Sequence, residues 1–192
     1  MNNDPAGAEK IKSFIGSLPA EVQSYILQDI ERWVDVVKPI GDPFERLWSG
    51  RQEFRSLIQY RMRIAQKKFE VAGLLSRFRS VVGSSPWMFV TNLFVSCDNV
   101  GPGFYIEHGF STVIFAKSIG KNFWVNQNVT IGSGKGGNPT ILDNVSVRAN
   151  SVVIGNITVA NGVVVGAGAI LNFDVPEGSK VVMQKPRVLL PD

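Results

Sequence analysis

The residue most suited to acid–base chemistry in this chain is His108, the only histidine. An imidazole with an ordinary pKa of about 6.5 can take a proton from a hydroxyl group near neutral pH. His108 stands between Glu107 and Gly109, and the glycine indicates a turn from which the side chain can project. A lone histidine is more often structural or merely exposed, so the surrounding elements decide between the two interpretations.

The segment from Gly132 to Pro139 is the second candidate for chemistry. Its glycines either permit a flexible turn or let backbone N–H groups approach a ligand closely. Although it contains Lys135, the segment lacks the spacing and the Lys-Ser/Thr ending of the nucleotide-binding P-loop. We therefore expect an extruded loop next to the face that carries His108, and no P-loop.

Both candidates lie in a region with a six-residue repeat. Apolar residues recur at every sixth position, apart from four extra residues in the glycine-rich loop: Ile119, Val125, Ile131, Ile141, Val147, Val153, Val159, Val165 and Leu171. Three positions further on stand Asn122, Asn128, Asn144, Asn150, Asn156, Gly162, Gly168 and Asp174. These residue types enter the left-handed backbone region most cheaply, so each hexad predicts a short strand followed by a bend. Three bends close a triangular coil, which is typical of a parallel β-helix.

The repeat continues toward the N-terminus through Val113, Ile106 and Val100, with one extra residue between the first two. We therefore expect the β-helix to begin near residue 94 and to have four coils or slightly more. Counting hexads in threes places Gln127, Ala149 and Ala167 on the same face as His108. This arrangement predicts a shallow groove, floored by small residues, with the imidazole at its top.

The N-terminal part of the chain has helical periodicity. Apolar residues between residues 8 and 80 recur at three- and four-residue steps, which predicts three or four helices. Gly41-Asp42-Pro43 is a helix stop and start signal, and Val81–Pro86 has linker composition. We expect a helical N-terminal domain over residues 1–85 and a β-helix domain with a C-terminal tail over residues 86–192. The predicted fold class is α+β, a helical segment followed by a parallel β-helix.

The composition indicates a folded protein in a reducing compartment. A single cysteine, Cys97, excludes an intramolecular disulfide, and the polar start does not resemble a secretory signal. No apolar run reaches the length of a bilayer-crossing helix, so a cytoplasmic location is expected. One histidine is too few for a zinc site of the carbonic-anhydrase type, and no metal is expected.

The net charge of +4 comes largely from a basic segment between Arg51 and Arg79. We interpret this segment first as a solvated helical face. Neither a nucleic-acid-binding motif nor aromatic residues interleaved with the basic ones accompany it, so nucleic acid is not an expected partner. A peripheral contact with an acidic membrane surface stays open, because the charge density suffices for one.

The run from Val100 to Arg187 resembles the catalytic domain of hexapeptide-repeat acyltransferases. Within that group it is most similar to serine O-acetyltransferases and their relatives in surface-polysaccharide clusters. The matching motifs, in the family's order, are Ile-Glu-His-Gly at 106–109, the run 126–132 and Pro-Thr-Ile at 139–141. Glu-Phe-Arg at 53–55 and Tyr-Arg at 60–61 resemble the helical segment of those relatives more weakly. The resemblance implies that the coil is left-handed.

The resemblance also implies acetyl-CoA as co-substrate and a role for each matching residue. His108 falls on the family's catalytic histidine and Glu107 on the acid before it, here one methylene longer than the usual Asp. The implied acetyl-CoA-binding residues are Gly132, Gly134, Lys135, Gly136, Ala149, Ala167, Lys185 and Arg187. Glu107, Gln127 and Asn138 are the expected substrate-binding residues. The implied assembly is a homotrimer, or a dimer of trimers, with the acyl-CoA groove between neighbouring subunits.

The mechanism expected from these residues is direct acetyl transfer without a metal. His108 takes the proton of the acceptor hydroxyl and returns it to the leaving thiolate. Glu107 orients either the imidazole or the acceptor, and an amide of the loop from Gly132 to Gly136 stabilises the oxyanion.

One departure from the family concerns the acceptor. Serine acetyltransferases typically carry an Arg-His pair just before the proline of the loop, where this chain has Gly137-Asn138. Without that carboxylate anchor, a neutral sugar hydroxyl in surface polysaccharide or its precursor is the favoured acceptor. Three alternatives stay open: a serine O-acetyltransferase of cysteine biosynthesis, an N-acetyltransferase acting on a nucleotide-linked amino sugar, and a non-catalytic β-helix scaffold.

Overall fold

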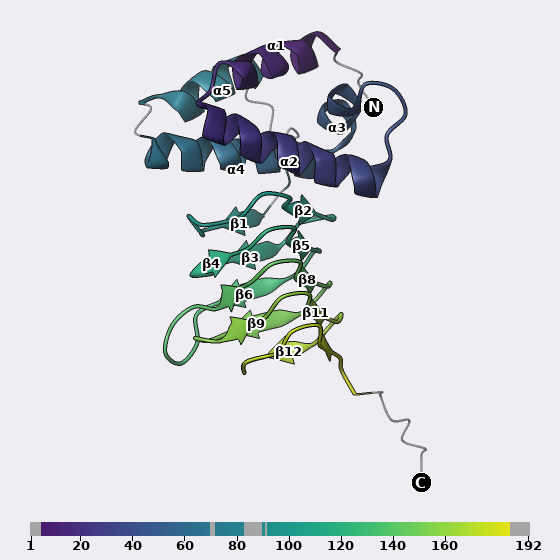
Figure 1. Ribbon diagram of the computed structural model, residues 1–192, viewed down its shortest axis with the longest axis vertical. Coiled ribbons are helices and arrows are strands. Elements are labelled where there is room, and N and C mark those ends of the chain that lie inside the picture. The colour runs from purple at the N-terminus through teal and green to yellow at the C-terminus, as the bar shows by residue number, and fades with distance from the viewer. Residues whose placement is uncertain (1–4, 70–71, 83–89, 91, 185–192) are drawn as a thin grey trace.

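The computed structural model describes residues 5–69, 72–82, 90 and 92–184. Five helices form a layer at one end of a coil of short strands, and the coil extends away from that layer (Figure 1). The helices are α1 (Pro5–Gly16), α2 (Ala20–Val37), α3 (Pro43–Gly50), α4 (Gln52–Lys68) and α5 (Leu74–Val82). The predicted fold class, a helical segment followed by a left-handed parallel β-helix, is confirmed.

The number of helices differs from the predicted three or four. α3 and α4 are separate helices because Arg51 between them has an extended backbone, with φ −131° and ψ 108°. The apolar spacing continues across this break, so the periodicity does not reveal it. The predicted stop and start signal is confirmed: the Glu45 N–H donates to the Asp42 side chain at 2.7 Å, and Pro43 opens α3. The predicted domain boundary near residue 85 lies outside the described residues.

Each coil crosses three parallel sheets in turn, which we name after one strand. The β2 face contains β2 (Tyr105–Ile106), β5 (Trp124–Val125), β8 (Ser146–Val147), β11 (Val164–Val165) and β13 (Lys180–Val181). The β3 face contains β1 (Leu93–Val95), β3 (Thr112–Ile114), β6 (Thr130–Gly132), β9 (Val152–Ile154) and β12 (Ile170–Leu171). The β4 face contains β4 (Ser118–Ile119), β7 (Thr140–Ile141) and β10 (Thr158–Val159). The coil therefore begins at Leu93, next to the predicted residue 94.

Most bends of the coil use the left-handed residues that the repeat predicts. The predicted positions that are left-handed are Asn122, Asn128, Asn144, Asn150, Gly162 and Gly168, whereas the predicted Asn156 and Asp174 are not left-handed. Asn side chains also link successive coils, as where Asn128 Nδ2 donates to Asn150 Oδ1 at 3.1 Å. One bend is shifted: Gly155, with φ +102°, takes the left-handed conformation in place of Asn156. The glycine-rich loop causes this shift, because it lies directly against Gly155.

The interior of the coil is filled by the repeating apolar residues. All nine predicted apolar positions from Ile119 to Leu171 are buried. Val113, however, is only half-buried, and Ile114 points inward and pairs with Ile131. Ile106 and Ile114 are eight residues apart, whereas their partners Val125 and Ile131 are six apart, so this corner contains two extra residues rather than one.

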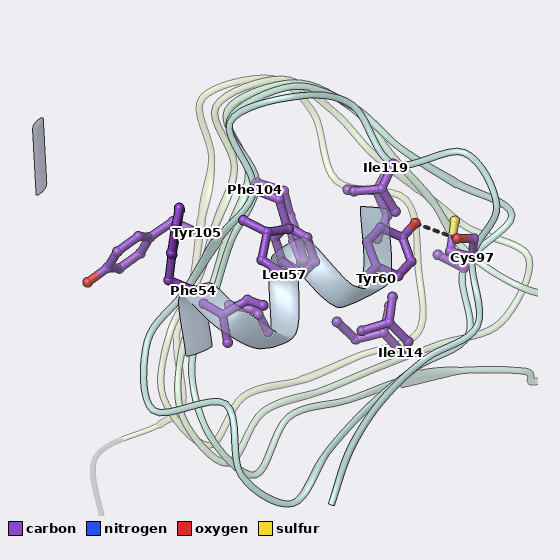
Figure 2. Packing of buried hydrophobic residues seen from close by; sticks show 14 of the residues in the cluster. Phe54, Leu57, Tyr60, Cys97, Phe104, Tyr105, Ile114 and Ile119 are labelled. Carbon is purple, nitrogen blue, oxygen red and sulfur yellow. Dashed lines mark hydrogen bonds between the residues drawn. The ribbon is translucent and has the colours of Figure 1, made fainter. Parts of the chain in front are cut away.

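The helical layer closes the open end of the coil. In Figure 2, Leu57 and Tyr60 of α4 lie over the apolar interior beside Phe104, and the Tyr60 hydroxyl donates to the Cys97 carbonyl at 2.6 Å. The Trp33 indole N–H of α2 donates to the Phe104 carbonyl at 2.9 Å. The two parts of the chain therefore share one continuous core.

A buried ion pair fixes this junction. Arg61 Nε donates to Asp29 Oδ2 at 2.8 Å, and Arg61 also donates to the Val100 and Gly101 carbonyls at 2.7 Å each. Asp29 Oδ1 accepts the Gly103 N–H at 2.8 Å. Burial raises the pKa of Asp29, whereas Arg61 and the neighbouring amides act in the opposite direction.

The basic segment is a solvated face only in part. Arg51, Arg63, Lys67, Lys68, Arg77 and Arg79 are exposed, as expected, whereas Arg55 and Arg61 are buried. Arg55 donates to the carbonyl of Trp48. The two lysines at the end of α4 pair with carboxylates, Lys67 with Asp98 and Lys68 with Glu21. Much of this positive charge therefore joins the helices to one another and to the coil.

Candidate active site

His108 lies at the corner between β2 and β3 and is exposed to solvent. Its backbone is left-handed, with φ +59°, and its carbonyl accepts the Phe110 N–H. Gly109 has no room for a side chain, since an added Cβ would lie 2.4 Å from Ile106 Cγ2. A non-glycine residue in this conformation is uncommon and is often found at functional sites. The enlarged corner thus presents the imidazole on the outside of the coil.

Glu107, the residue before His108, is held by two side chains of the next coil. Its Oε2 accepts Trp124 Nε1 at 3.1 Å and Asn126 Nδ2 at 2.9 Å. Its Oε1 accepts no hydrogen bond from any described residue. The carboxylate is therefore fixed through one oxygen, and the other is available to the imidazole or to a bound hydroxyl.

Two further acceptor atoms near this corner have no partner. Asn126 Oδ1 and Gln127 Oε1 are buried and accept no hydrogen bond from the described residues. The orientation of the Asn126 amide is defined, because its nitrogen donates to Glu107. A buried acceptor without a donor is costly, so a ligand that brings a hydroxyl or N–H group here would be favoured.

The column of small residues is shifted relative to the one we predicted. Gln127, Ala149 and Ala167 each precede a left-handed residue in successive coils. The Asn128 N–H donates to Phe110 O at 3.0 Å, so Phe110 rather than His108 lies in line with this column. The two extra residues displace His108 outward from it, although both stay at the same corner. A hexad count cannot detect this, because it assumes equal spacing in every coil.

The corner amides are free to bind a ligand. The N–H groups of Ala149 and Ala167 make no hydrogen bond to another described residue. Their methyl side chains are partly or fully exposed and leave the corner open. This strip fits an extended amide-containing chain such as the pantetheine arm of coenzyme A.

The glycine-rich loop forms a small hairpin at a different corner. Gly134 and Gly137 exchange backbone hydrogen bonds of 3.0 and 3.3 Å, with Lys135 and Gly136 at the exposed tip. Asn138 Oδ1 accepts a hydrogen bond from Ser133 Oγ within the loop. The loop projects between β6 and β7 (Figure 1), and an added Cβ on Gly134 would lie 2.9 Å from Gly155 Cα.

Within one chain, the loop and His108 are not brought together. His108 lies before the start of β3, whereas the loop follows the end of β6 and so lies at the opposite edge of the same face. Lys185 and Arg187, the expected tail residues of the acetyl-CoA site, lie outside the described residues.

Sequence analysis missed two residues that hold Glu107. Trp124 was not among the candidate residues, and Asn126 appeared only within the matching run 126–132. They lie 17 and 19 residues after Glu107, which is one coil, and this spacing is the signal that could have identified them.

A separate cavity of about 370 Å³ lies between the helical layer and the β4 face. Its apolar lining includes Val22, Tyr25, Ile64, Phe69, Ile119 and Leu142. His108 and Glu107 do not line it.

Over the described residues, no group of three or more His, Cys, Asp or Glu side chains is arranged to hold a metal ion. No described helix has the length and apolar character needed to span a membrane.

Relatives of known sequence match about half of this chain. The serine acetyltransferase of Bacillus pumilus (strain SAFR-032) is 41% identical over 97 residues, which are 47% of this chain and 44% of that protein. A protein of Escherichia coli (strain K12) named as a colanic acid biosynthesis acetyltransferase, WcaB, is 38% identical over 93 residues, 46% of this chain and 57% of that protein. This chain thus spans about half the length of these curated relatives, and no family model matches it.

Solved structures match most of the chain. Serine acetyltransferase of Neisseria gonorrhoeae in complex with serine aligns with a TM-score of 0.62 and 24% identity, over 93% of this chain and 73% of that one. Isoform 3 from Entamoeba histolytica, in complex with cysteine, aligns with a TM-score of 0.65 and 23% identity, over 90% and 62% of the two chains. These identities establish the shared fold. The sequence matches, over about half of this chain, support its resemblance to the hexapeptide-repeat, serine O-acetyltransferase-like family.

Proposed function

We propose that this protein is an acetyl-CoA-dependent O-acetyltransferase of the cytoplasm that acetylates a sugar hydroxyl of surface polysaccharide or its precursor. The observation that carries the proposal is the exposed imidazole of His108, one residue after the anchored carboxylate of Glu107. The likeness to serine acetyltransferases and to WcaB supports the same class of reaction. A non-catalytic scaffold has no need of a strained histidine beside a half-satisfied carboxylate.

The chemistry follows from the groups at this corner. Acetyl-CoA supplies an activated thioester when it is bound. His108 accepts the proton of the acceptor hydroxyl at a ring nitrogen and later releases it to the departing thiolate. Glu107 Oε1 orients the imidazole or the acceptor, because Oε2 is already engaged by Trp124 and Asn126.

The co-substrate would occupy the corner next to this pair. The free N–H groups of Ala149 and Ala167 suit the carbonyl groups of a pantetheine arm. The unpaired N–H groups of Lys135 and Gly136 at the loop tip are the candidates to stabilise the developing oxyanion. These loop groups can act only if the loop comes from a neighbouring subunit.

The outer side of the β3 face supports assembly into a homotrimer. Its outward positions are largely apolar: Phe94, Val113, Phe115, Val152, Ile154 and Ile170. Ile170 is 67% exposed and Phe94 49% exposed, whereas Ser118, Thr140 and Thr158 occupy the outward positions of the β4 face. His108 and the glycine-rich loop flank the β3 face on opposite edges. Three copies packed cyclically through this face would bring one subunit's loop toward the next subunit's His108.

Serine is a second candidate acceptor, favoured by the 41% identity to a serine acetyltransferase. Purified protein with acetyl-CoA should be offered serine, amino sugars, neutral sugars and oligosaccharides, and the products identified by mass spectrometry. We expect ester formation on a saccharide. Ester on serine alone would assign the second candidate, amide products would indicate an N-acetyltransferase, and no product with any acceptor would contradict acetyl transfer.

A further inference from the structure

Two arginines each place a guanidinium near the indole ring of Trp124, which is one of the two residues that donate to Glu107. The guanidinium of Arg148 lies 4.4 Å from the ring centroid, and that of Arg32, from α2, lies 5.7 Å from it. Tyr105 packs edge-on against the same indole at 4.9 Å. These contacts hold two positive charges beside the candidate active site.

Neither of these arginines is paired with an acid. Over the described part of the chain, Arg32 and Arg148 form no salt bridge, whereas Arg61, Lys67 and Lys68 each do. Arg32 Nε is also buried without a hydrogen-bond partner. A guanidinium offers a planar set of donors that matches a carboxylate or a phosphate. Two unpaired arginines with one buried donor therefore form a site for an anion.

The position of this site relative to Glu107 is set by the coil. Backbone N–H groups of Glu107, Asn126 and Arg148 donate to Val125, Val147 and Val165 in succession, so these three residues share one column. Glu107 and Arg148 are two strand spacings apart, which is about 10 Å between backbones. The Arg148 side chain shortens this separation, because it folds over Trp124 toward Glu107.

We propose that Arg148 and Arg32 form an anion-binding subsite for the acceptor. The acceptor then carries a carboxylate or phosphate in addition to the hydroxyl that His108 deprotonates. This inference rests on the proposed function and narrows it to acidic saccharides or nucleotide-linked sugars. It also modifies the expectation of a neutral acceptor, since the anchor absent at Gly137-Asn138 is supplied from another coil.

The test compares acceptors with and without a negative charge. Full-length wild type and Arg148→Gln are assayed with acetyl-CoA and a glucuronate-containing disaccharide, a uridine diphosphate sugar, or a neutral disaccharide. We expect KM for the charged acceptor to rise about 10- to 100-fold in the variant, with the neutral acceptor changed less than about twofold. The two charged acceptors distinguish a carboxylate from a phosphate. Lys180→Gln, the same charge change four coils from Glu107 on the same face, should have no effect.

Binding without acetyl-CoA separates this inference from the proposed function. If wild type binds a charged saccharide, Arg148→Gln does not, and Arg148→Lys recovers part of the affinity, the subsite stands even without acetyl transfer. If transfer occurs but Arg148→Gln changes charged and neutral acceptors equally, or changes neither, the subsite is wrong and the acetyltransferase stands.

Discussion

Two clusters of charge in this molecule differ in how completely they are paired. At the junction between helices and coil, Arg61 and Asp29 are 5% and 0% exposed and bond to each other and to backbone groups. At the candidate active site, one oxygen of Glu107, the guanidinium groups of Arg32 and Arg148, and the imidazole of His108 have no such partner among the described residues. The comparison suggests that charges with a structural role are satisfied internally, while those with a binding role are held in place but left open.

The largest effect should come from breaking the satisfied cluster. Asp29→Ala leaves the Arg61 guanidinium buried without its carboxylate, which should lower the free energy of unfolding by about 3–5 kcal/mol. Chemical denaturation monitored by circular dichroism measures this loss. Arg148→Gln is the matched change in the open cluster and should alter stability by less than about 0.5 kcal/mol. Similar losses in both variants would contradict the distinction.

A smaller effect is expected from loosening the support of Glu107. Asn126→Leu removes one of the two donors to Oε2 and should lower kcat about 10-fold, the value of a hydrogen bond to a charged group. KM for acetyl-CoA should stay the same, because Asn126 acts through Glu107. Steady-state kinetics measure both constants, and Asn126→Gln, which keeps the donor, should restore part of the rate. A change confined to KM would argue against a positioning role.

The smallest effect concerns the exposed cap of α3, which lies outside both clusters. Amide donation from Glu45 and the ammonium of Lys12 lower the pKa of Asp42, so the folded state favours its charged form. Asp42→Ala should cost about 1 kcal/mol at pH 7. The part of this stabilisation that depends on the charge of Asp42 is present above the pKa that the residue has in the unfolded chain. It is lost as the pH falls through the lower pKa that Asp42 has in the folded protein. Unfolding at pH 7 and pH 2 measures this, with Asp42→Asn as the control that keeps the cap without the charge.

Much of the coil could be predicted from the sequence, because its repeat demands an inward apolar residue and a left-handed bend in each hexad. The two-residue enlargement at His108 could not, since Val113 lies six residues before Ile119 and fits the repeat, whereas the residue that points inward, Ile114, lies only five before it. The support of Glu107 and the Asp29–Arg61 pair were also missed, because these contacts join residues 17 to 32 positions apart. Such contacts depend on how coils and helices stack, which a linear pattern does not specify.

The central claim is that His108 is the base in acetyl transfer, and His108→Asn tests it most directly. Asparagine tolerates the left-handed backbone at this position, so the variant should keep the thermal stability of the wild type. We predict that kcat/KM for acetylation of the best acceptor falls by about 10²–10⁴-fold. A folded His108→Asn variant with a rate close to that of the wild type would contradict the account.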